Sequence, residues 1–393
     1  MPKISDFVEL KKPRLSARYS RAKVPIGYFI EDYMRGDIDV VGDFKRLMKH
    51  KNDVFEYVFI DEHYKFFFTR FIPEVLIHSK EQDERIVRSH YDNRNDFFSW
   101  FLGPRMVYTS AFFHATDESL EVAQDRKMDL VAQKIQLKAG EKLLDIGCGW
   151  GTLVMYLAKH YGVDATGITI AQAGVDWGMN QIRENGMEDR ARIMRMDYRD
   201  IPEKKYHKIT CLEMAEHVGI KNFKKFMAQV YNLLDDDGLF YLQIAGLRAR
   251  PGIFAPIMNE DTVWGLFMNK YIFSGADASM PLSFVVKNLE RVGFEIHSVE
   301  NIGIHYSRTI DLWYENWMHN ESKIVEKYGI YWFRMYQIFL GWSVEIAKQG
   351  SSTCFQIVCN KNRDTFNRYR WIGAVNIGER DSVKMHSSDT IKV

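Results

Sequence analysis

The sequence of 393 residues predicts an α/β protein whose centre is a doubly wound, mostly parallel sheet. Three observations lead to this fold class. Apolar runs typical of buried strands alternate with helical patterns from Lys142 to Cys359. The first run passes directly into a turn that contains Gly147, Gly149 and Gly151. Polar residues come directly after several of the strands, at the edge where such sheets bind ligands.

The elements follow from local patterns. We expect strands at residues 142–146, 164–169, 191–196, 207–212, 238–245, 294–300 and 353–359. We expect helices at residues 120–135, 152–161, 172–185, 222–234 and 282–292. The regular alternation stops between residues 247 and 281, and residues 307–348 read as a helical stretch rich in aromatic side chains.

The segments outside the sheet divide the chain into regions. Residues 1–23 and 361–393 are polar and aperiodic, so we expect a loose tail at each end. Residues 24–120 form a helical N-terminal region, whose last part is placed to fold over the glycine turn as a lid. Its aromatic residues either pack as a helical subdomain on the core or form an amphipathic surface at a lipid interface.

The composition excludes some classes of function. The chain has 53 basic and 52 acidic residues, and this balance argues against a nucleic-acid partner. Phe, Trp and Tyr make up 14% of the chain, which indicates a large core or a wide apolar binding surface. No signal peptide and no apolar run of membrane-spanning length is visible. The four cysteines lack metal-ligand spacing and read as buried reduced thiols, and no metal is expected.

The glycine turn is the first candidate site. No Lys-Ser or Lys-Thr follows it, which excludes a phosphate-binding P-loop, and the spacing fits a dinucleotide fingerprint poorly. S-adenosylmethionine remains the best candidate ligand. Asp145 can order the turn or meet an ammonium group, and Asp197 with Tyr198 follows the third strand where an adenine could lie.

Residues 212–219 follow the fourth strand and carry two carboxylates and an imidazole. If this segment is helical, Glu213 and His217 share a face while Glu216 points elsewhere. Glu216 is our candidate to take or relay a proton near a reacting carbon. Helix capping is the structural alternative. Tyr306 is on its own more simply explained as a structural residue.

These motifs resemble the cyclopropane-fatty-acid synthases, a family of S-adenosylmethionine-dependent lipid methyltransferases. The segments that carry the resemblance are Leu144–Gly151, His90-Tyr91-Asp92, Ala215–Gly219, Lys270–Phe273 and His305-Tyr306. Further segments are similar to fungal sphingolipid 9-methyltransferases: Phe101–Met106, Ile209–His217, Trp264–Lys270 and Gly275–Ala278. The resemblance covers about residues 88 to 360. It implies a Rossmann-like methyltransferase domain over residues 121–360, with seven strands, the last antiparallel, and a helical substrate cap at 247–281 and 305–348.

The resemblance also implies roles for individual residues. Tyr108 and Thr109 would close over S-adenosylmethionine, Thr169 would meet its ribose, and Asp197 with Tyr198 would hold its adenine. Glu216 and Tyr306 would lie at the reacting carbon, where bacterial relatives hold a bicarbonate. The pocket cysteine and histidine of those relatives fall on Ser110 and Gln243 here, which argues against bicarbonate and against ring closure.

The function that follows is methyl transfer to an alkene carbon of a lipid chain, with a methyl-branched alkene on a sphingoid base as product. Alternatives left open are a cyclopropane synthase acting on phospholipid acyl chains, an amine methyltransferase and an inactive lipid- or cofactor-binding protein. The expected setting is intracellular and peripheral on a membrane, which the resemblance places at the endoplasmic reticulum. The oligomeric state is left open.

Overall fold

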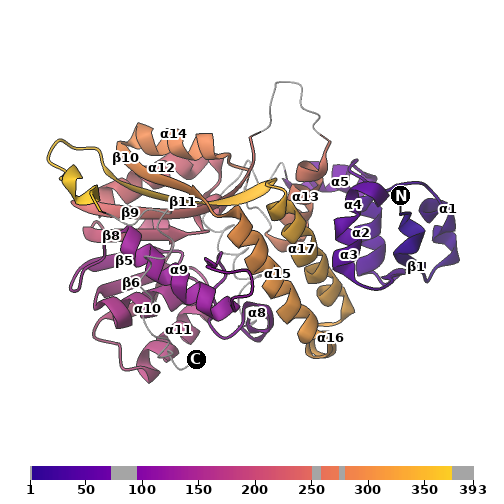
Figure 1. Cartoon of the computed structure of the whole chain (residues 1–393), viewed down its shortest axis with the longest axis horizontal. Helices are drawn as coiled ribbons and strands as arrows, with labels where there is room; N and C mark the ends of the chain where they lie inside the picture. Colours follow the sequence, from indigo (N-terminus) through magenta and orange to yellow (C-terminus); the bar gives the residue numbers. More distant parts are fainter. Residues whose placement is uncertain (1, 72–94, 250–257, 274–278, 374–393) are drawn as a thin grey trace.

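The structure is a computed structural model that describes residues 2–71, 95–249, 258–273 and 279–373 (Figure 1). Its centre is a seven-stranded sheet in the order β10-β11-β9-β8-β5-β6-β7. The strands are β5 (Lys142–Ile146), β6 (Asp164–Thr169), β7 (Ala191–Arg195), β8 (Tyr206–Leu212), β9 (Leu234–Leu247), β10 (Phe294–Asn301) and β11 (Ser352–Lys361). Neighbours among β5 to β9 pair in parallel, while β11 is antiparallel to both β9 and β10. The prediction of a seven-stranded sheet with an antiparallel last strand is confirmed.

The strand order reverses at β5, which pairs with β6 on one side and β8 on the other. The loops after β5 and β8 therefore diverge from the same edge, and a crevice opens between them. Helices cover both faces of the sheet (Figure 1). One face carries α9 (Leu120–Lys134), α10 (Thr152–Tyr161) and α11 (Gln172–Glu184), and the other carries α12 (Ile220–Leu233) and α14 (Leu282–Val292).

A helical half adjoins the carboxyl edge of the sheet and extends to the N-terminus (Figure 1). From the C-terminal part of the chain it contains α13 (Glu260–Phe267), a π-helical turn at Met268–Ile272, α15 (Gly303–His319), α16 (Glu321–Tyr328) and α17 (Ile330–Lys348). From the N-terminal part it contains α1 (Ser16–Tyr19), α2 (Ile26–Met34), α3 (Phe44–Lys49), α4 (Lys51–Val54), α5 (Asp61–Phe66), a π-helical turn at Phe67–Phe71, and α8 (Asn95–Leu102).

The helical half is held together by one aromatic core. Phe29 stacks with Tyr33 and tilts against Phe55, while the Phe97 ring meets Trp317 and Tyr336 at centroid distances of 5.0 and 4.7 Å. Most aromatic residues of the N-terminal region are therefore core, as the first of the two interpretations held. The single helical stretch expected at the C-terminal end is divided into three, because Asn320 and Gly329 (φ +86°) interrupt it.

Both expected tails are wrong for the residues that the structure describes. Val8–Leu10 pairs with Ile38–Val40, and Ile4 and Phe7 are buried, because apolar residues spaced among the charges reach the aromatic core. At the other end, Lys361 still belongs to β11, Phe366 is buried and Trp371 lies against His297. Aperiodic sequences of this kind can pack through a few anchoring side chains.

All four cysteines are free, as predicted, and three are buried, while Cys148 is half-buried. Along the described part of the chain, none of the helices combines the length and the apolar character needed to cross a bilayer.

Candidate active site

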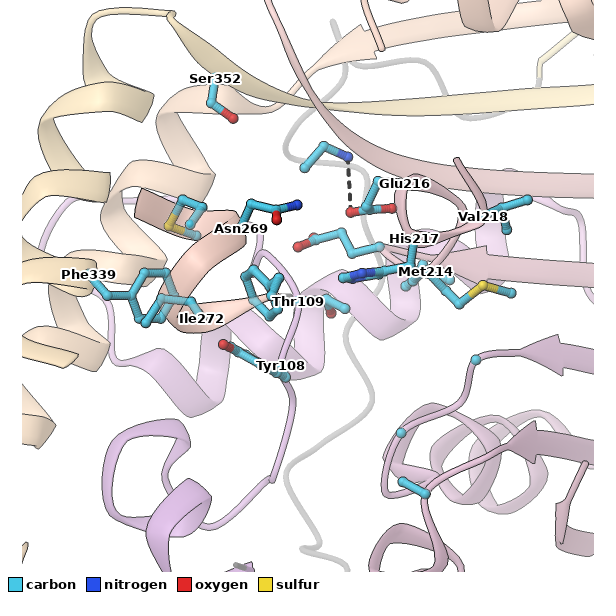
Figure 2. Close-up of a pocket in the computed structure, with 18 of the residues that line it drawn as sticks. Tyr108, Thr109, Met214, Glu216, His217, Val218, Asn269, Ile272, Phe339 and Ser352 are labelled. Carbon is cyan, nitrogen blue, oxygen red and sulfur yellow. Dashed lines mark hydrogen bonds between the residues drawn. The ribbon is translucent and has the colours of Figure 1, made fainter. Parts of the chain in front are cut away.

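A cavity of about 970 Å³ lies between the carboxyl edge of the sheet and the helical half. Figure 2 shows three residues around one space: Glu216 from the turn after β8, Asn269 from the π-helical turn at Met268–Ile272, and Tyr108 from the loop after α8. Ten of the predicted site residues line this cavity: Tyr108, Thr109, Asp145, Gly147, Gly149, Thr169, Asp197, Tyr198, Glu216 and Tyr306. The fold therefore brings together residues that are up to about half the chain apart.

Three predicted residues do not line the cavity: Gly151, Ser110 and Gln243. Gly151 (φ +80°) precedes α10, and a Cβ there would lie 2.0 Å from Cδ1 of Ile193, so this glycine serves packing against β7. The His90-Tyr91-Asp92 motif lies outside the described residues.

The glycine turn has the shape of a ligand cradle. Gly147 has φ +81°, and a Cβ there would lie 2.5 Å from Cγ of Met214, so only glycine lets the two loops approach. Gly149 has φ +56°, and no atom lies within 4 Å of a Cβ built on it. Gly174 of α11 is close to the turn as well, since its Cβ would lie 2.5 Å from the carbonyl oxygen of Gly149. Backbone thus faces the cavity without intervening side chains.

Asp145 is the penultimate residue of β5 and carries a buried carboxylate. Oδ1 accepts a hydrogen bond of 2.7 Å from the hydroxyl of Thr210. Burial raises the pKa of Asp145 to about 6, although the hydrogen bond and the charge of Lys127 act in the opposite direction. A cationic ligand in the cavity would favour the ionised form.

Asp197 and Tyr198 follow β7 at the same edge. The Asp197 carboxylate accepts hydrogen bonds from Nε and Nη2 of Arg199, at 2.7 and 2.6 Å, and from the Arg199 backbone N–H at 2.8 Å. Thr169, at the end of β6, accepts from the backbone N–H of Ala171 at 3.3 Å. These contacts fix the polar groups before any ligand arrives.

The segment after α8 lines the cavity through Met106–Thr109, and its action as a lid stays a prediction. Asn95 ties α8 to the glycine turn, because its Oδ1 accepts from Nε1 of Trp150 at 2.8 Å. The Tyr108 ring is surrounded by Phe98, Phe101 and Trp313 at centroid distances of 5.4 to 5.7 Å. Thr109 accepts from Nζ of buried Lys127 at 2.8 Å, and burial lowers the pKa of that lysine to about 8.

The segment after β8 is not the helix considered above. Glu213 takes φ +51°, a 3₁₀ turn follows at Ala215–Val218, and Glu213, Glu216 and His217 all line the cavity. Burial raises the pKa of Glu216 well above its usual range, and the nearby charge of Glu213 adds to the effect. Burial also raises the pKa of Tyr306 well above its usual range.

Glu213 is the functional candidate that the sequence reasoning passed over. Ser110 and Gln243 do not line the cavity themselves and instead hold Glu213. Oε1 of Glu213 accepts a hydrogen bond of 2.8 Å from the Ser110 backbone N–H and one of 2.6 Å from Nε2 of Gln243. The signal was present, since Glu213 directly follows an expected strand, but a helical register for the segment placed it away from Glu216.

The remaining lining is apolar and comes from the helical half. It includes Phe59, Phe67, Trp264, Phe273, Trp313 and Phe339. Two lining residues near the N-terminal region, Tyr64 and Phe68, are also exposed to solvent, at 46% and 64%. The polar end of the cavity is thus continuous with an apolar end that reaches the surface. Among the residues described, no group of three or more His, Cys, Asp or Glu side chains is arranged to hold a metal.

Comparisons with known proteins identify the family of the chain. A family model described as mycolic acid cyclopropane synthetase matches residues 78–357. The chain is 47% identical over 381 residues to the sphingolipid C9-methyltransferase of Komagataella phaffii, covering 94% of this chain and 77% of that one.

Two solved structures are also similar. The cyclopropane synthase MmaA2 from Mycobacterium tuberculosis has a TM-score of 0.67 and 26% identity, covering 71% of this chain and 98% of that chain. The mycolic acid cyclopropane synthase CmaA1, complexed with SAH and CTAB, has a TM-score of 0.67 and 25% identity over the same shares.

Proposed function

The chain belongs to the mycolic acid cyclopropane synthetase family of S-adenosylmethionine-dependent lipid methyltransferases, and we propose that its own substrate is an unsaturated sphingoid base. The product is a methyl-branched alkene, with the branch at carbon 9 as in the name of its relatives. One observation carries this proposal: the same cavity is lined at the sheet edge by Asp145 and the glycine turn and at its other end by apolar aromatic side chains.

The residues at the sheet edge fit S-adenosylmethionine. The open space beside Gly149 admits backbone contact, and the Asp145 carboxylate suits a cationic ligand. In this proposal Thr169 contacts the ribose, Asp197 and Tyr198 contact the adenine, and Tyr108 with Thr109 closes the site. The cyclopropane synthase bound to SAH, the demethylated form of this donor, supports the assignment. When bound, S-adenosylmethionine supplies an activated methyl group on a sulfonium.

The helical half aligns the lipid and keeps water out. The rings of Phe273, Trp313 and Phe339 line the apolar end, where they can hold a hydrocarbon chain by shape. Aromatic faces also stabilise the positive charge that develops on the chain when its double bond receives a methyl group. Exclusion of water protects that cation from capture.

The outcome of the reaction depends on where the proton leaves. Loss of a proton from the new methyl group closes a cyclopropane, whereas loss from the chain carbon restores the alkene with a branch. Ser110 and Gln243 donate to Glu213, so bicarbonate is not part of this proposal. A cyclopropane synthase acting on phospholipid acyl chains is the second candidate; the names of the structural neighbours favour its ring closure, not that particular substrate.

The test of the reaction is incubation of the purified chain with isotopically labelled S-adenosylmethionine and a total lipid extract. We expect label in sphingolipids, and ozonolysis should cleave the labelled product because the double bond remains. Label in phospholipid acyl chains that resist ozonolysis would establish the cyclopropane synthase instead. Absence of label from every lipid would contradict both candidates.

We also propose that the cavity is entered from a membrane surface through Tyr64 and Phe68, which are exposed at its apolar end. Phe68→Ser should weaken sedimentation with vesicles of neutral phospholipid. Ile372→Ser is the matched control, since Ile372 is 79% exposed but lies outside the cavity lining. Equal binding of the two variants would contradict this entry route.

A further inference from the structure

Glu213 occupies an unusual place at the end of β8. Its φ of +51° lies in the left-handed region, which is unfavourable for a residue with a Cβ. Its backbone N–H donates to the carbonyl oxygen of Gln243 at 2.7 Å, and the side chain lines the cavity with Glu216 and Tyr306. Backbone strain of this kind is kept where the surrounding structure fixes it, often at functional sites.

The carboxylate of Glu213 is held by donors on one oxygen only. Oε1 accepts from the Ser110 N–H, from Nε2 of Gln243 and, at 3.6 Å, from Sγ of Cys354. Within the described part of the chain these donors all contact Oε1 and none contacts Oε2, which leaves Oε2 for the cavity. Burial raises the pKa of Glu213, while these donors and the charge of Lys127 lower it. The donors stabilise the anion.

A series of buried hydrogen bonds fixes the orientation of the Gln243 amide. Nζ of Lys134 donates to Oε1 of Gln356 at 2.7 Å, and Nε2 of Gln356 donates to Oε1 of Gln243 at 3.3 Å. The hydroxyl of Tyr241 donates to the same oxygen at 3.3 Å. Because Oε1 of Gln243 accepts both bonds, its Nε2 group must point to Glu213.

Glu216 lies in a different environment. Its Oε1 accepts a long hydrogen bond of 3.4 Å from the backbone N–H of Ala245, drawn as a dashed line in Figure 2. No partner within the described residues contacts its buried Oε2. The two neighbouring carboxylates are stabilised unequally: the pKa of Glu216 is raised well above its usual range by burial and by the charge of Glu213, whereas the donors to Glu213 oppose the effect of its burial. Glu216 is therefore the member of the pair that holds a proton more tightly, and Glu213 is the member that ionises more readily.

We propose that Glu213 is the general base of the reaction, that Glu216 acts as its neutral partner, and that Ser110 and Gln243 are positioning residues. This inference rests on the proposed methyl transfer to a lipid alkene. Once the methyl group is on the chain, the C–H bond of the carbon that received it breaks. Its electron pair forms the new C=C bond with the adjacent cationic carbon, and the proton moves to Oε2 of Glu213.

The charged and titratable groups around this base come from several elements. Lys127 reaches it from α9, Glu216 from the 3₁₀ turn, Tyr306 from α15 and Cys354 from β11. Lys127 is the cation among them, and it bonds to Thr109.

The first test compares Glu213→Gln with Glu216→Gln on the same lipid. A positioned base contributes about 10²- to 10⁴-fold, so Glu213→Gln should lower kcat at least a hundredfold while calorimetry shows S-adenosylmethionine binding within about twofold. Glu216→Gln imitates the protonated acid and should lose less than tenfold. A larger loss for Glu216→Gln, or a Glu213→Gln variant within tenfold of the active wild type, would overturn the assignment. An inactive wild type would instead refute the proposed function.

The second test uses Glu213→Gly, which relieves the positive φ and leaves the donors of Ser110 and Gln243 facing a vacated space. Added formate should raise the melting temperature of this variant but not that of the wild type, because it binds those donors. Formate should also restore turnover at least tenfold. Rescue without any thermal shift, or equal shifts in both proteins, would contradict the anion-binding geometry. The thermal shift needs no lipid and is therefore independent of the proposed function.

Discussion

The two walls of the cavity are built by different means. The wall at the sheet edge consists of backbone turns and short polar side chains that are bonded to one another, such as Asp145 with Thr210 and Asp197 with Arg199. The opposite wall consists of large side chains on helices, such as Trp313 and Phe339, that meet through their rings and surfaces. Directed bonds suit a small polar ligand of fixed shape, whereas packed rings suit a hydrocarbon chain. The two walls should therefore fail in different ways when mutated.

The largest effect should come from the contact that ties the helical wall together. Lys51 of α4 is buried and bonds to Glu260 of α13 at 2.7 Å and to Gln349 at 2.9 Å. Removing Lys51 leaves the Glu260 carboxylate without a counter-charge, although the neutral donors Trp342 and Gln349 still bond to it. Lys51→Met should therefore lower the free energy of unfolding by about 3–5 kcal/mol. Urea denaturation measures this. Lys49→Met, at an exposed position of α3, is the control. A difference below 1 kcal/mol between the two variants would mean that the pair does not hold this wall.

On the sheet wall, Asp145→Asn should change how stability depends on pH. The pKa of Asp145 is raised from 3.8 to about 6, which corresponds to about 3 kcal/mol. A raised pKa contributes stability that is fully present below pH 3.8 and is lost as the pH rises through about 6. The wild type should therefore lose up to about 3 kcal/mol of unfolding free energy relative to Asp145→Asn between pH 4 and pH 7. Calorimetric melts across that range, with S-adenosylmethionine absent, are the measurement. A difference that does not vary with pH would contradict the assignment.

The sequence predicted the two walls unequally. The strand bounds of β5 and β6 and the helix bounds of α10 and α14 agree with expectation, because periodicity and glycine positions are local signals. Ten of the predicted site residues reach the cavity, since the carboxyl ends of parallel strands share one edge.

The helical wall was less predictable because its structure depends on contacts between distant segments. Phe97 packs on Trp317 and Tyr336, more than 200 residues later, and nothing in the local pattern indicates this pairing. The role of Glu213 was not predicted for a related reason. Its left-handed backbone is maintained by Gln243 and Ser110 from other parts of the chain, whereas local propensity favours a helix there.

A matched pair of glycine substitutions compares the walls directly. Gly174 lies on the sheet wall and Gly265 on the helical wall, and both line the cavity. A Cβ at Gly174 would lie 2.5 Å from the carbonyl oxygen of Gly149, whereas a Cβ at Gly265 meets nothing within 4 Å. Overpacking costs about 1–3 kcal/mol, so Gly174→Ala should weaken S-adenosylmethionine binding about 5- to 150-fold. Gly265→Ala should leave it within twofold. Titration calorimetry measures both affinities, and similar values would show that the turn adapts to the added methyl group.

The smallest effect should come from trimming a single ring on the helical wall. Phe339 of α17 lies edge-on to Phe273 and Tyr336, at centroid distances of 6.0 and 5.6 Å. An aromatic pair adds about 0.5–1.5 kcal/mol beyond its buried area, so Phe339→Leu should lower kcat/KM for the lipid about three- to tenfold. The affinity for S-adenosylmethionine should stay within twofold, because no directed bond of the sheet wall is touched. Steady-state kinetics with a series of chain lengths tests this, and the preference should move towards bulkier chains. If Phe339→Leu weakened S-adenosylmethionine binding as strongly as lipid turnover, the two walls would be coupled. Directed bonds on one wall and packed rings on the other would then not act on separate ligands.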